Sequence, residues 1–451
     1  MRRLFTFILA ISVTILLWGT IQSTEPREYT AHNPILIEDN DEFTLENGVI
    51  AGSGTEDDPY IIAADISTAG VRGWEIEAKV GWGIWIKETT AHFIISGCKI
   101  YGAKPMPQTV GSAIHLEGVR NGRVEGCKLV ENRYGIFLEG SAEIEIINNC
   151  IKDNKDGIRL EDSTQGKIDS NIVMNNTDGI ILEASTQNVL FKNSIRSSKH
   201  YGIVLIDSSG NTLINNELSD NQRGGLRVYG NRVTDYDNSI DRSNKINGKS
   251  IYYLYKERVR DFASGSGTED DPYILEGIDT THLTVAGIDH LVIRRSIVSQ
   301  GDGMGLAYTE NVRLHAVIVA GNWEGIRLES CQGIELIGNT VEENWSGIVL
   351  LNSSENEIAA NSVKGNSNFG IYLTNSSNNR IYHNNFNKNG TNAYDNRPNR
   401  WDDGYPSGGN YWDDYTGEDA NGDGIGDTPY RILGWGNEDR YPLMEPIGGT
   451  G

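Results

Sequence analysis

The sequence predicts an all-β solenoid, specifically a right-handed single-stranded parallel β-helix. A Gly-Ile-x-Leu-Glu unit begins at Gly135, Gly157 and Gly179, at a spacing of 22 residues. A fixed period of this size is typical of a solenoid, in which each repeat is one supersecondary unit. Apolar residues alternate within each unit, which is the periodicity of a strand, and no apolar run has helical spacing. Roughly 22 residues at about 3.3 Å each suit one coil of three short strands.

The repeats fall into two blocks. The segment GSGTEDDPYI occurs at residues 52–61 and again at 265–274, which indicates an internal duplication. Each copy precedes a block, so we interpret it as the start of a stack, where an atypical first coil covers the core. The predicted division is a signal peptide over 1–23, a linker over 24–44, blocks over 45–262 and 263–397, and a C-terminal cap over 398–451. The sequence leaves open whether the blocks form one continuous stack.

A longer step separates the first two coils. The units at Gly83 and Ala113 are 30 residues apart, which predicts a loop over residues 101–112. Loops that leave a solenoid often carry its function, although a tolerated insertion gives the same pattern.

One asparagine recurs before most of the repeat units. A column of asparagines at one turn forms a ladder of amide hydrogen bonds along the stack, which is a structural role. The asparagines are Asn149, Asn171, Asn193, Asn216, Asn339 and Asn361.

The N-terminus and the net charge bear on location and partners. Arg2 and Arg3 precede an apolar run over residues 4–18, which predicts a secretory signal and a secreted, periplasmic or cell-surface protein. An uncleaved anchor is the alternative, and it is the one membrane attachment that we expect. The net charge of −23 argues against nucleic acid, whose phosphates need a basic surface.

Two cysteines share a sequence context. Cys98 and Cys127 lie in GCKI and GCKL, so they are predicted to occupy the same turn on adjacent coils. That places them within reach of a disulfide, or makes them two small buried turn residues. The sequence leaves both readings open.

The C-terminal segment contains a candidate calcium loop. The run DANGDGIGD offers oxygen ligands at the spacing of an EF-hand-type loop, with a carbonyl at Ile425. Position 12 is Tyr430 rather than Glu, and the alternative is a Gly/Asp turn without an ion. We expect a structural calcium ion here, and the predicted ligands are Asp419, Asn421, Asp423, Ile425 and Asp427. Eight aromatic residues over 401–441 predict a cap, or else a platform for stacking sugars.

An acidic column is the candidate catalytic site. Four glutamates follow the marker position of successive coils by four residues, so stacking places their carboxylates about 4.8 Å apart on the outer face. Arg159 is predicted to share this face and to offset part of the charge. Such spacings suit the carboxylate pairs of glycosidases, and the alternative is a solvated acidic rib. The glutamates are Glu117, Glu139, Glu161 and Glu183. A lyase would need a basic residue such as Arg159, Arg227 or Arg327 beside calcium.

The repeats, the GSGTEDDPYI segment and the closing GGNYWDDYTGEDANGDGIGDTPYRI resemble the NosD-like secreted parallel β-helix proteins over residues 45–445. These proteins share the pectate-lyase-type repeat of carbohydrate-binding and sugar-hydrolysis modules. The resemblance implies the fold, and for the name-giving member it implies copper delivery to nitrous oxide reductase. Copper is unlikely on the residues themselves, because soft sites use Met, His and Cys. The chain has five Met and eight scattered His, with His92 and His115 as one candidate pair.

Three functions follow as hypotheses. The leading one is an exported protein that binds a polysaccharide or cell-surface glycan along its solenoid face. The second is a polysaccharide hydrolase or lyase acting through carboxylates on that face. The third is copper delivery.

Overall fold

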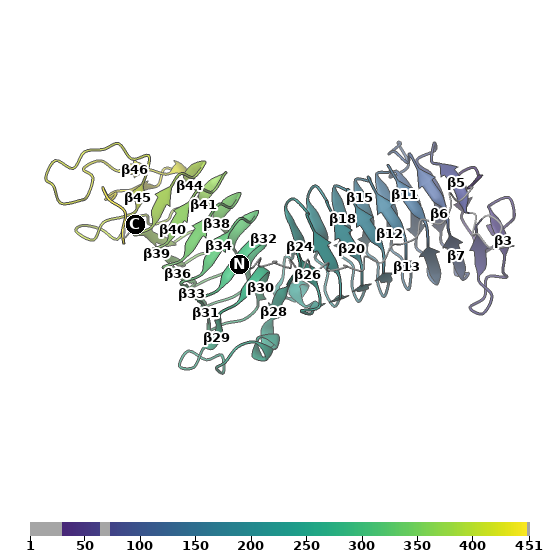
Figure 1. The fold of residues 1–451 in the computed structure, drawn as a ribbon, viewed down its shortest axis with the longest axis horizontal. Coiled ribbons are helices and arrows are strands. Elements are labelled where there is room, and N and C mark those ends of the chain that lie inside the picture. The colour runs from purple at the N-terminus through teal and green to yellow at the C-terminus, as the bar shows by residue number, and fades with distance from the viewer. Residues whose placement is uncertain (1–28, 64–72, 449–451) are drawn as a thin grey trace, which may run out of the picture.

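The computed structural model describes residues 29–63 and 73–448, and they form two β-helical stacks (Figure 1). The predicted signal peptide lies outside the described residues. Nearly all strand pairs are parallel and join successive coils in register. The described residues contain three short 3-10 helices and no α-helix: η1 (Asn40–Glu42), η2 (Val233–Tyr236) and η3 (Lys256–Asp261). None of the helices in these ranges is long and apolar enough to cross a membrane.

The first stack has three sheets. The eight-stranded sheet, which carries the candidate site, comprises β2 (Ile35–Ile37), β6 (Trp82–Lys87), β9 (Ser112–Glu117), β12 (Tyr134–Glu139), β15 (Asp156–Glu161), β18 (Asp178–Glu183), β21 (Tyr201–Ile206) and β24 (Gly224–Tyr229). The nine-stranded sheet comprises β3 (Val49–Ala51), β4 (Tyr60–Ile62), β7 (Phe93–Ser96), β10 (Gly122–Glu125), β13 (Glu145–Ile147), β16 (Lys167–Asp169), β19 (Val189–Phe191), β22 (Thr212–Ile214) and β25 (Ser239–Ile240). The ten-stranded sheet comprises β1 (Thr30–Ala31), β5 (Trp74–Glu77), β8 (Lys99–Tyr101), β11 (Lys128–Val130), β14 (Cys150–Lys152), β17 (Ile172–Met174), β20 (Ser194–Arg196), β23 (Glu217–Ser219), β26 (Lys245–Ile246) and β27 (Lys249–Ser250).

The second stack has a six-stranded sheet and a sheet that turns a corner within β32 (Ile297–Ala307). One arm of the latter comprises β28 (Tyr252–Tyr255), β30 (Asp279–Ala286), β35 (Glu324–Glu329), β38 (Ser346–Leu351), β41 (Phe369–Thr374), β44 (Thr391–Asp395) and β47 (Leu433–Gly434). The other arm comprises β34 (Ile318–Ala320), β37 (Thr340–Glu342), β40 (Ser362–Lys364), β43 (Asn385–Asn387) and β45 (Tyr411–Trp412). The six-stranded sheet comprises β29 (Tyr273–Glu276), β31 (Leu291–Arg294), β33 (Arg313–His315), β36 (Glu335–Ile337), β39 (Glu357–Ala359) and β42 (Arg380–Tyr382). A separate pair joins β46 (Tyr430–Arg431) and β48 (Glu438–Asp439).

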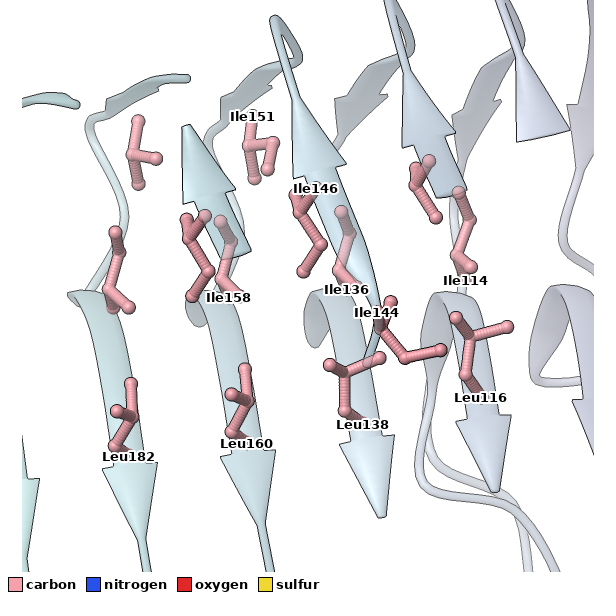
Figure 2. Packing of buried hydrophobic residues seen from close by; sticks show 14 of the residues in the cluster. Ile114, Leu116, Ile136, Leu138, Ile144, Ile146, Ile151, Ile158, Leu160 and Leu182 are labelled. Atoms are coloured by element: carbon pink, nitrogen blue, oxygen red, sulfur yellow. The ribbon is translucent and has the colours of Figure 1, made fainter. Parts of the chain in front are cut away.

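Columns of identical apolar side chains fill the interior of each stack. Leu138 of β12 pairs with Leu116 of β9 and with Leu160 of β15, and all three are at most 2% exposed. Figure 2 shows these leucines and the neighbouring isoleucines pointing into the coil. The Ile-x-Leu alternation of the sequence is therefore the pattern that separates core from surface.

The asparagine ladder runs through the turns. Asn149 donates from Nδ2 to Oδ1 of Asn171 at 3.0 Å, and Asn171 donates in the same way to Asn193 at 3.0 Å. The main-chain N–H of Asn149 also donates to Asn171 Oδ1, at 2.9 Å. Cys127 takes the ladder position one coil earlier, because its main-chain N–H donates to Asn149 Oδ1 at 2.9 Å. Cys98 and Cys127 are buried and form no disulfide, which agrees with their interpretation as small buried turn residues.

The two copies of GSGTEDDPYI fold alike near the start of the two stacks. In the first copy the main-chain N–H groups of Ser53 and Gly54 donate to the carbonyl of Asp58. In the second copy the equivalent groups over residues 266–267 donate to the carbonyl of Asp271. The copies lead into β4 and β29, which lie at or near the edge of their sheets.

The structure differs from the predicted division at two places. Ile35 and Ile37 fall in the predicted linker, but they form β2, pair with β6 and are fully buried. Because this strand has only three residues and lies between Pro34 and an acidic run, its alternation is too short to predict a strand from the sequence. At the other boundary, β28 pairs with β30, so the second ladder already begins at residue 252 rather than 263.

The stacks meet at an angle without a shared ladder (Figure 1). Their interiors form two apolar clusters, and the cluster of the first stack also takes in Tyr253, Ala286 and Ala307 from the first strands of the second. At the far end, Trp412 stacks on Phe386 with ring centroids 4.5 Å apart, and Trp401 is fully buried beside it. Residues after 398 thus supply large aromatic side chains that cover the last coil.

Candidate functional site

The predicted acidic column lies in register on the outer face of the eight-stranded sheet. Glu139 pairs with Glu117 on one side and with Glu161 on the other, and Glu161 pairs with Glu183. Each glutamate follows a buried leucine, so the strand alternation turns its side chain outward. The four carboxylates occupy adjacent coils, as the period of 22 predicted.

Arg159 neutralises one end of this column. Its Nε donates to Glu161 at 2.5 Å, and its Nη2 donates to Glu183. Its Nη1 donates to Asp156 at 3.3 Å. The guanidinium therefore binds the third and fourth glutamates and leaves Glu117 and Glu139 at the other end without a cationic Lys or Arg partner in the described ranges.

His115 joins the unneutralised end. It lies two residues before Glu117 on β9, and its Nε2 is 3.3 Å from Oε2 of Glu139. One ligand atom from each of His115, Glu117 and Glu139 lies within 4.8 Å of the others. In the part of the chain that the structure describes, no other trio of His, Cys, Asp or Glu side chains is gathered this closely.

Burial shifts the pKa values of His115 and Glu139. Desolvation, assisted by the charge of Lys87, lowers the pKa of His115 to about 4. Desolvation also raises the pKa of Glu139, and the charges of Glu117 and Glu161 raise it further. The site at neutral pH therefore contains a neutral imidazole beside carboxylates that repel one another.

The loop over residues 102–111 covers this cluster and forms a pocket of about 230 Å³. Gln108, Thr109 and Val110 line one side, and Trp82, Trp85, Ser112 and the cluster line the other. Six buried side-chain N or O atoms among the described residues lack a hydrogen-bond partner. Four of the six line this pocket, namely Trp82 Nε1, Thr109 Oγ1, Ser112 Oγ and His115 Nε2. Buried polar groups are normally satisfied, so four together make this pocket a candidate binding site.

Aromatic rings fix the imidazole. Trp85 of β6 stacks on His115 with centroids 5.0 Å apart and an interplanar angle of 14°. Phe137 of β12 lies on the other side of His115, at 4.8 Å. Trp85 also donates from Nε1 to Oε2 of Glu117 at 3.1 Å. Sequence reasoning missed these partners, although Trp85, His115 and Phe137 share the outward position of three successive repeat units.

A second feature is an aromatic groove on β35, β38 and β41 of the second stack. Trp323 and Trp345 stack with centroids 5.1 Å apart and an interplanar angle of 6°, and Trp345 is 45% exposed. The groove has a volume of about 330 Å³, and Phe369 and Tyr372 line it together with Glu324 and Arg327. The sequence signal was present, because Trp323 and Trp345 each lie two residues before a marker glycine.

The joint between the stacks contains a buried Thr284–His282–Asp302 chain. His282 Nδ1 lies 2.7 Å from Asp302 Oδ2, and His282 Nε2 lies 2.9 Å from Thr284 Oγ1. The order resembles a nucleophile–base–acid triad, but the adjoining cavity measures about 40 Å³, too small for a substrate. Asp302 also accepts main-chain hydrogen bonds from β24, so the chain connects the stacks.

The other predicted site residues have structural contacts. Arg227 donates to Glu324 across the joint at 2.8 Å, and Arg327 donates to Glu329 at 3.1 Å. His92 precedes β7 of the nine-stranded sheet and borders a different pocket from His115, so the two histidines form no pair.

The candidate calcium loop folds around its own carboxylates. Asp419 accepts from the main-chain N–H of Gly422 at 2.7 Å and of Gly424 at 2.8 Å. Asp423 accepts from the N–H of Ile425 at 2.9 Å, which holds its pKa below the usual range. Asp427 accepts from the N–H of Ala420 at 2.8 Å. Among the described residues these three carboxylates do not form a group arranged to hold a metal ion, and calcium at this loop remains a prediction.

Fold and strand pairing define a right-handed parallel β-helix protein, and comparisons with known families agree. The family described as "Right handed beta helix region" matches residues 19–151. The family described as "Periplasmic copper-binding protein (NosD)" matches residues 106–259 and 279–417. Since the second match covers more than half of the chain, the protein belongs to the NosD family. No curated protein sequence matches the chain.

Solved structures with this type of fold share little sequence with the chain. The A-module of the mannuronan C-5 epimerase AlgE4 from Azotobacter vinelandii is 12% identical, with 80% of this chain and 99% of that chain covered and a TM-score of 0.30. PfbA, a surface adhesin of Streptococcus pneumoniae, is 10% identical, with coverages of 63% and 78% and a TM-score of 0.32. The DFA-IIIase of Arthrobacter chlorophenolicus A6 is 12% identical, with coverages of 71% and 74% and a TM-score of 0.33. These scores are low, and the fold assignment depends on the strand pairing.

The family description names copper, and the residues test that implication. Thiolate and thioether ligands suit Cu⁺, whereas imidazole and carboxylate suit divalent ions such as Zn²⁺ and Cu²⁺. The closest trio in the described ranges has one imidazole and two carboxylates and no cysteine. These donors do not fit a cuprous site.

Proposed function

We propose that the protein is exported and binds carbohydrate along the outer face of its stacks. The observation that carries the proposal is the aromatic groove of the second stack, where Trp323 and Trp345 present parallel rings beside charged groups. Sugar rings have apolar C–H faces and a polar rim, so they pair with aromatic faces flanked by hydrogen-bonding side chains. Glu324 and Arg327 supply that polar flank.

The geometry favours a chain-like ligand. Tyr372 stacks on Tyr394 of the next coil with centroids 5.0 Å apart and an interplanar angle of 14°. The aromatic positions thus continue over four coils, from Trp323 on the turn before β35 to Tyr394 on β44. An extended glycan contacts several coils at once, which supports a polysaccharide or cell-surface glycan as the partner.

Binding to a glycan array followed by calorimetry on the best glycan tests the proposal. We expect Trp345→Ala to lower the affinity by about 10-fold or more, because one exposed stacking ring contributes about 1–3 kcal/mol. Leu45→Ala is the control, since Leu45 is 81% exposed and apolar but lies outside the groove. Equal affinities of parent and Trp345→Ala, or no bound glycan, would contradict the proposal.

A polysaccharide hydrolase is the second candidate, and one observation favours it. Burial raises the pKa of Glu139, while the adjacent Glu161 is held by Arg159 at 2.5 Å. Glycoside hydrolysis uses two carboxyl groups in different environments, one with a raised pKa that suits proton donation and one in a polar, hydrogen-bonded setting. Reducing-sugar release that Glu139→Gln abolishes would support an enzyme, whereas binding without release would support a binding module.

Export requires its own test. The family description is periplasmic, and the basic and apolar start of the chain supports a signal. Expression of the full chain followed by N-terminal sequencing of the mature protein distinguishes a cleaved signal from a retained anchor. Accumulation of the uncleaved chain in the cytoplasm would contradict export.

A further inference from the structure

We propose that His115, Glu117 and Glu139 bind a divalent transition-metal ion of the Zn²⁺ type beneath the loop over residues 102–111. The trio combines one imidazole nitrogen with two carboxylates, all within 4.8 Å of one another. In-register pairing of β9 with β12 produces this arrangement, because Glu117 lies opposite Glu139 and His115 lies two residues earlier on the same face.

The contact between His115 and Glu139 has the geometry of two ligands of one ion. Zn²⁺ lies about 2.0–2.2 Å from nitrogen and oxygen ligands, so two ligands at a tetrahedral angle are about 3.3–3.5 Å apart. The observed distance from Nε2 to Oε2 is 3.3 Å. The contact between the two side chains does not have the orientation of a hydrogen bond. His115 is only 5% exposed, and its Nε2 has no hydrogen-bond partner.

The charge of the trio is only partly compensated, because Lys87 lies opposite Glu117 in the strand pairing but forms its ion pair with another glutamate. Lys87 pairs with Glu38 at 2.7 Å, and Arg159 binds the glutamates further along the column. Glu117 and Glu139 form no ion pair with a Lys or Arg side chain of the described residues. A divalent cation would cancel two neighbouring carboxylate charges, which otherwise repel each other.

Supporting contacts hold the ligands in place. The indole N–H of Trp85 donates to Glu117 at 3.1 Å, and the rings of Trp85 and Phe137 enclose the imidazole of His115. Metal sites depend on such outer contacts to orient their ligands. They limit the rearrangement needed when an ion enters.

The open side of the ion would face the pocket. Three protein ligands leave a tetrahedral ion with a free position, the arrangement of zinc sites that exchange ligands. The pocket beyond measures about 230 Å³, and Trp82 Nε1, Thr109 Oγ1 and Ser112 Oγ lack partners there. These groups suit an oxygen ligand, such as a hydroxyl or carboxylate, bound to the ion.

Calorimetric titration of the full chain with Zn²⁺, after removal of metals by a chelator, tests the site. We expect one ion per chain, and a loss of affinity of at least about 10-fold in His115→Ala and in Glu139→Gln. Glu161→Gln is the matched control, because Glu161 occupies the same column but is bound by Arg159. It should keep the affinity within about two-fold. Circular dichroism shows whether each variant keeps the β-sheet signal.

Titration with Co²⁺ gives a second readout. A four-coordinate Co²⁺ ion produces strong visible absorption, which His115→Ala should remove and Glu161→Gln should retain. Since these titrations contain no glycan, their outcome is independent of the glycan-binding test.

Three outcomes would overturn the proposal. The first is no stoichiometric binding of Zn²⁺ by the folded chain. The second is unchanged binding in His115→Ala together with loss in Asp419→Ala, which would place the ion in the C-terminal loop. The third is an equal loss in Glu161→Gln and Glu139→Gln, which would mean that the ion is a loose counterion of the acidic column.

Discussion

Asp302 in the second stack accepts a hydrogen bond at 2.8 Å from the main-chain N–H of Leu226 in the first. The same carboxylate accepts from the N–H of Gly225 and contacts His282 at 2.7 Å. Its side chain is 6% exposed. Because no ladder crosses the joint, this carboxylate takes the place of the strand that would otherwise satisfy the end of β24.

Asp302→Ala should therefore lower the free energy of unfolding by about 2–4 kcal/mol, since buried N–H groups would lose their acceptor. Urea unfolding followed by tryptophan fluorescence measures this loss. Asp279→Ala is the control, because Asp279 makes an exposed ion pair with Lys249 at 2.6 Å near the same joint. It should change stability by less than about 1 kcal/mol, and equal effects of the two variants would contradict the role of Asp302.

Asn171→Ala should destabilise the first stack by about 3 kcal/mol. Asn171 is fully buried, donates to the carbonyl of Ile146 at 2.8 Å and accepts from Asn149, so its loss leaves several buried partners unpaired. Asn171→Cys should cost less than Asn171→Ala, because Cys127 already occupies the equivalent position one coil before Asn149. Thermal denaturation of the three proteins checks the order, and an alanine variant as stable as the parent would contradict it.

Asp439 should make stability depend on pH. Burial raises the pKa of Asp439 from its ordinary 3.8 to about 6, despite hydrogen bonds from Asn410 and Trp412. The folded protein thus binds more protons than the unfolded chain between about pH 4 and 6. This group's contribution to stability should fall by about 3 kcal/mol as pH rises through that window and stay low above it.

Asp439→Asn removes this titration. The difference in unfolding free energy between parent and variant, measured in urea from pH 4 to 7, isolates Asp439 from the other carboxylates. A difference that does not change with pH would show that Asp439 titrates normally.

Calcium should stabilise the C-terminal region if the loop over residues 419–427 binds it. Excess calcium at about 100 times the dissociation constant adds about 2.7 kcal/mol to the stability of a one-site protein. Asp423→Ala should abolish the increment, and Glu418→Gln, a change at an exposed neighbour outside the predicted ligands, should retain it. An unfolding midpoint that millimolar calcium leaves unchanged would refute the predicted site.

Sequence reasoning reached the parts of the site that repeat. The period of 22 placed Glu117, Glu139 and Glu161 on adjacent coils, and the strand pairing confirms that register. The same period predicted the asparagine ladder and the loop over residues 101–112. These features could be predicted because residues one repeat apart in the sequence of a solenoid are neighbours in space.

The parts of the site that do not follow the repeat could not be predicted from the sequence. The sequence offers only His92 as a partner for His115, because the true partners depend on the loop that buries His115 and on its ring contacts with Trp85 and Phe137. The contacts at the joint between the stacks could not be predicted either, since Asp302 and Leu226 are 76 residues apart and share no repeat.

The sequence by itself determined the scaffold of this protein: the solenoid, the inward Ile and Leu columns, the turn asparagines and the outward glutamates. Each depends on strand alternation and a constant period, which are local properties of the chain. The tertiary structure decided which outward side chains become a site. It did so by burial, because one loop and two aromatic rings enclose His115 beside Glu117 and Glu139, whereas Arg159 neutralises the next glutamates of the same column.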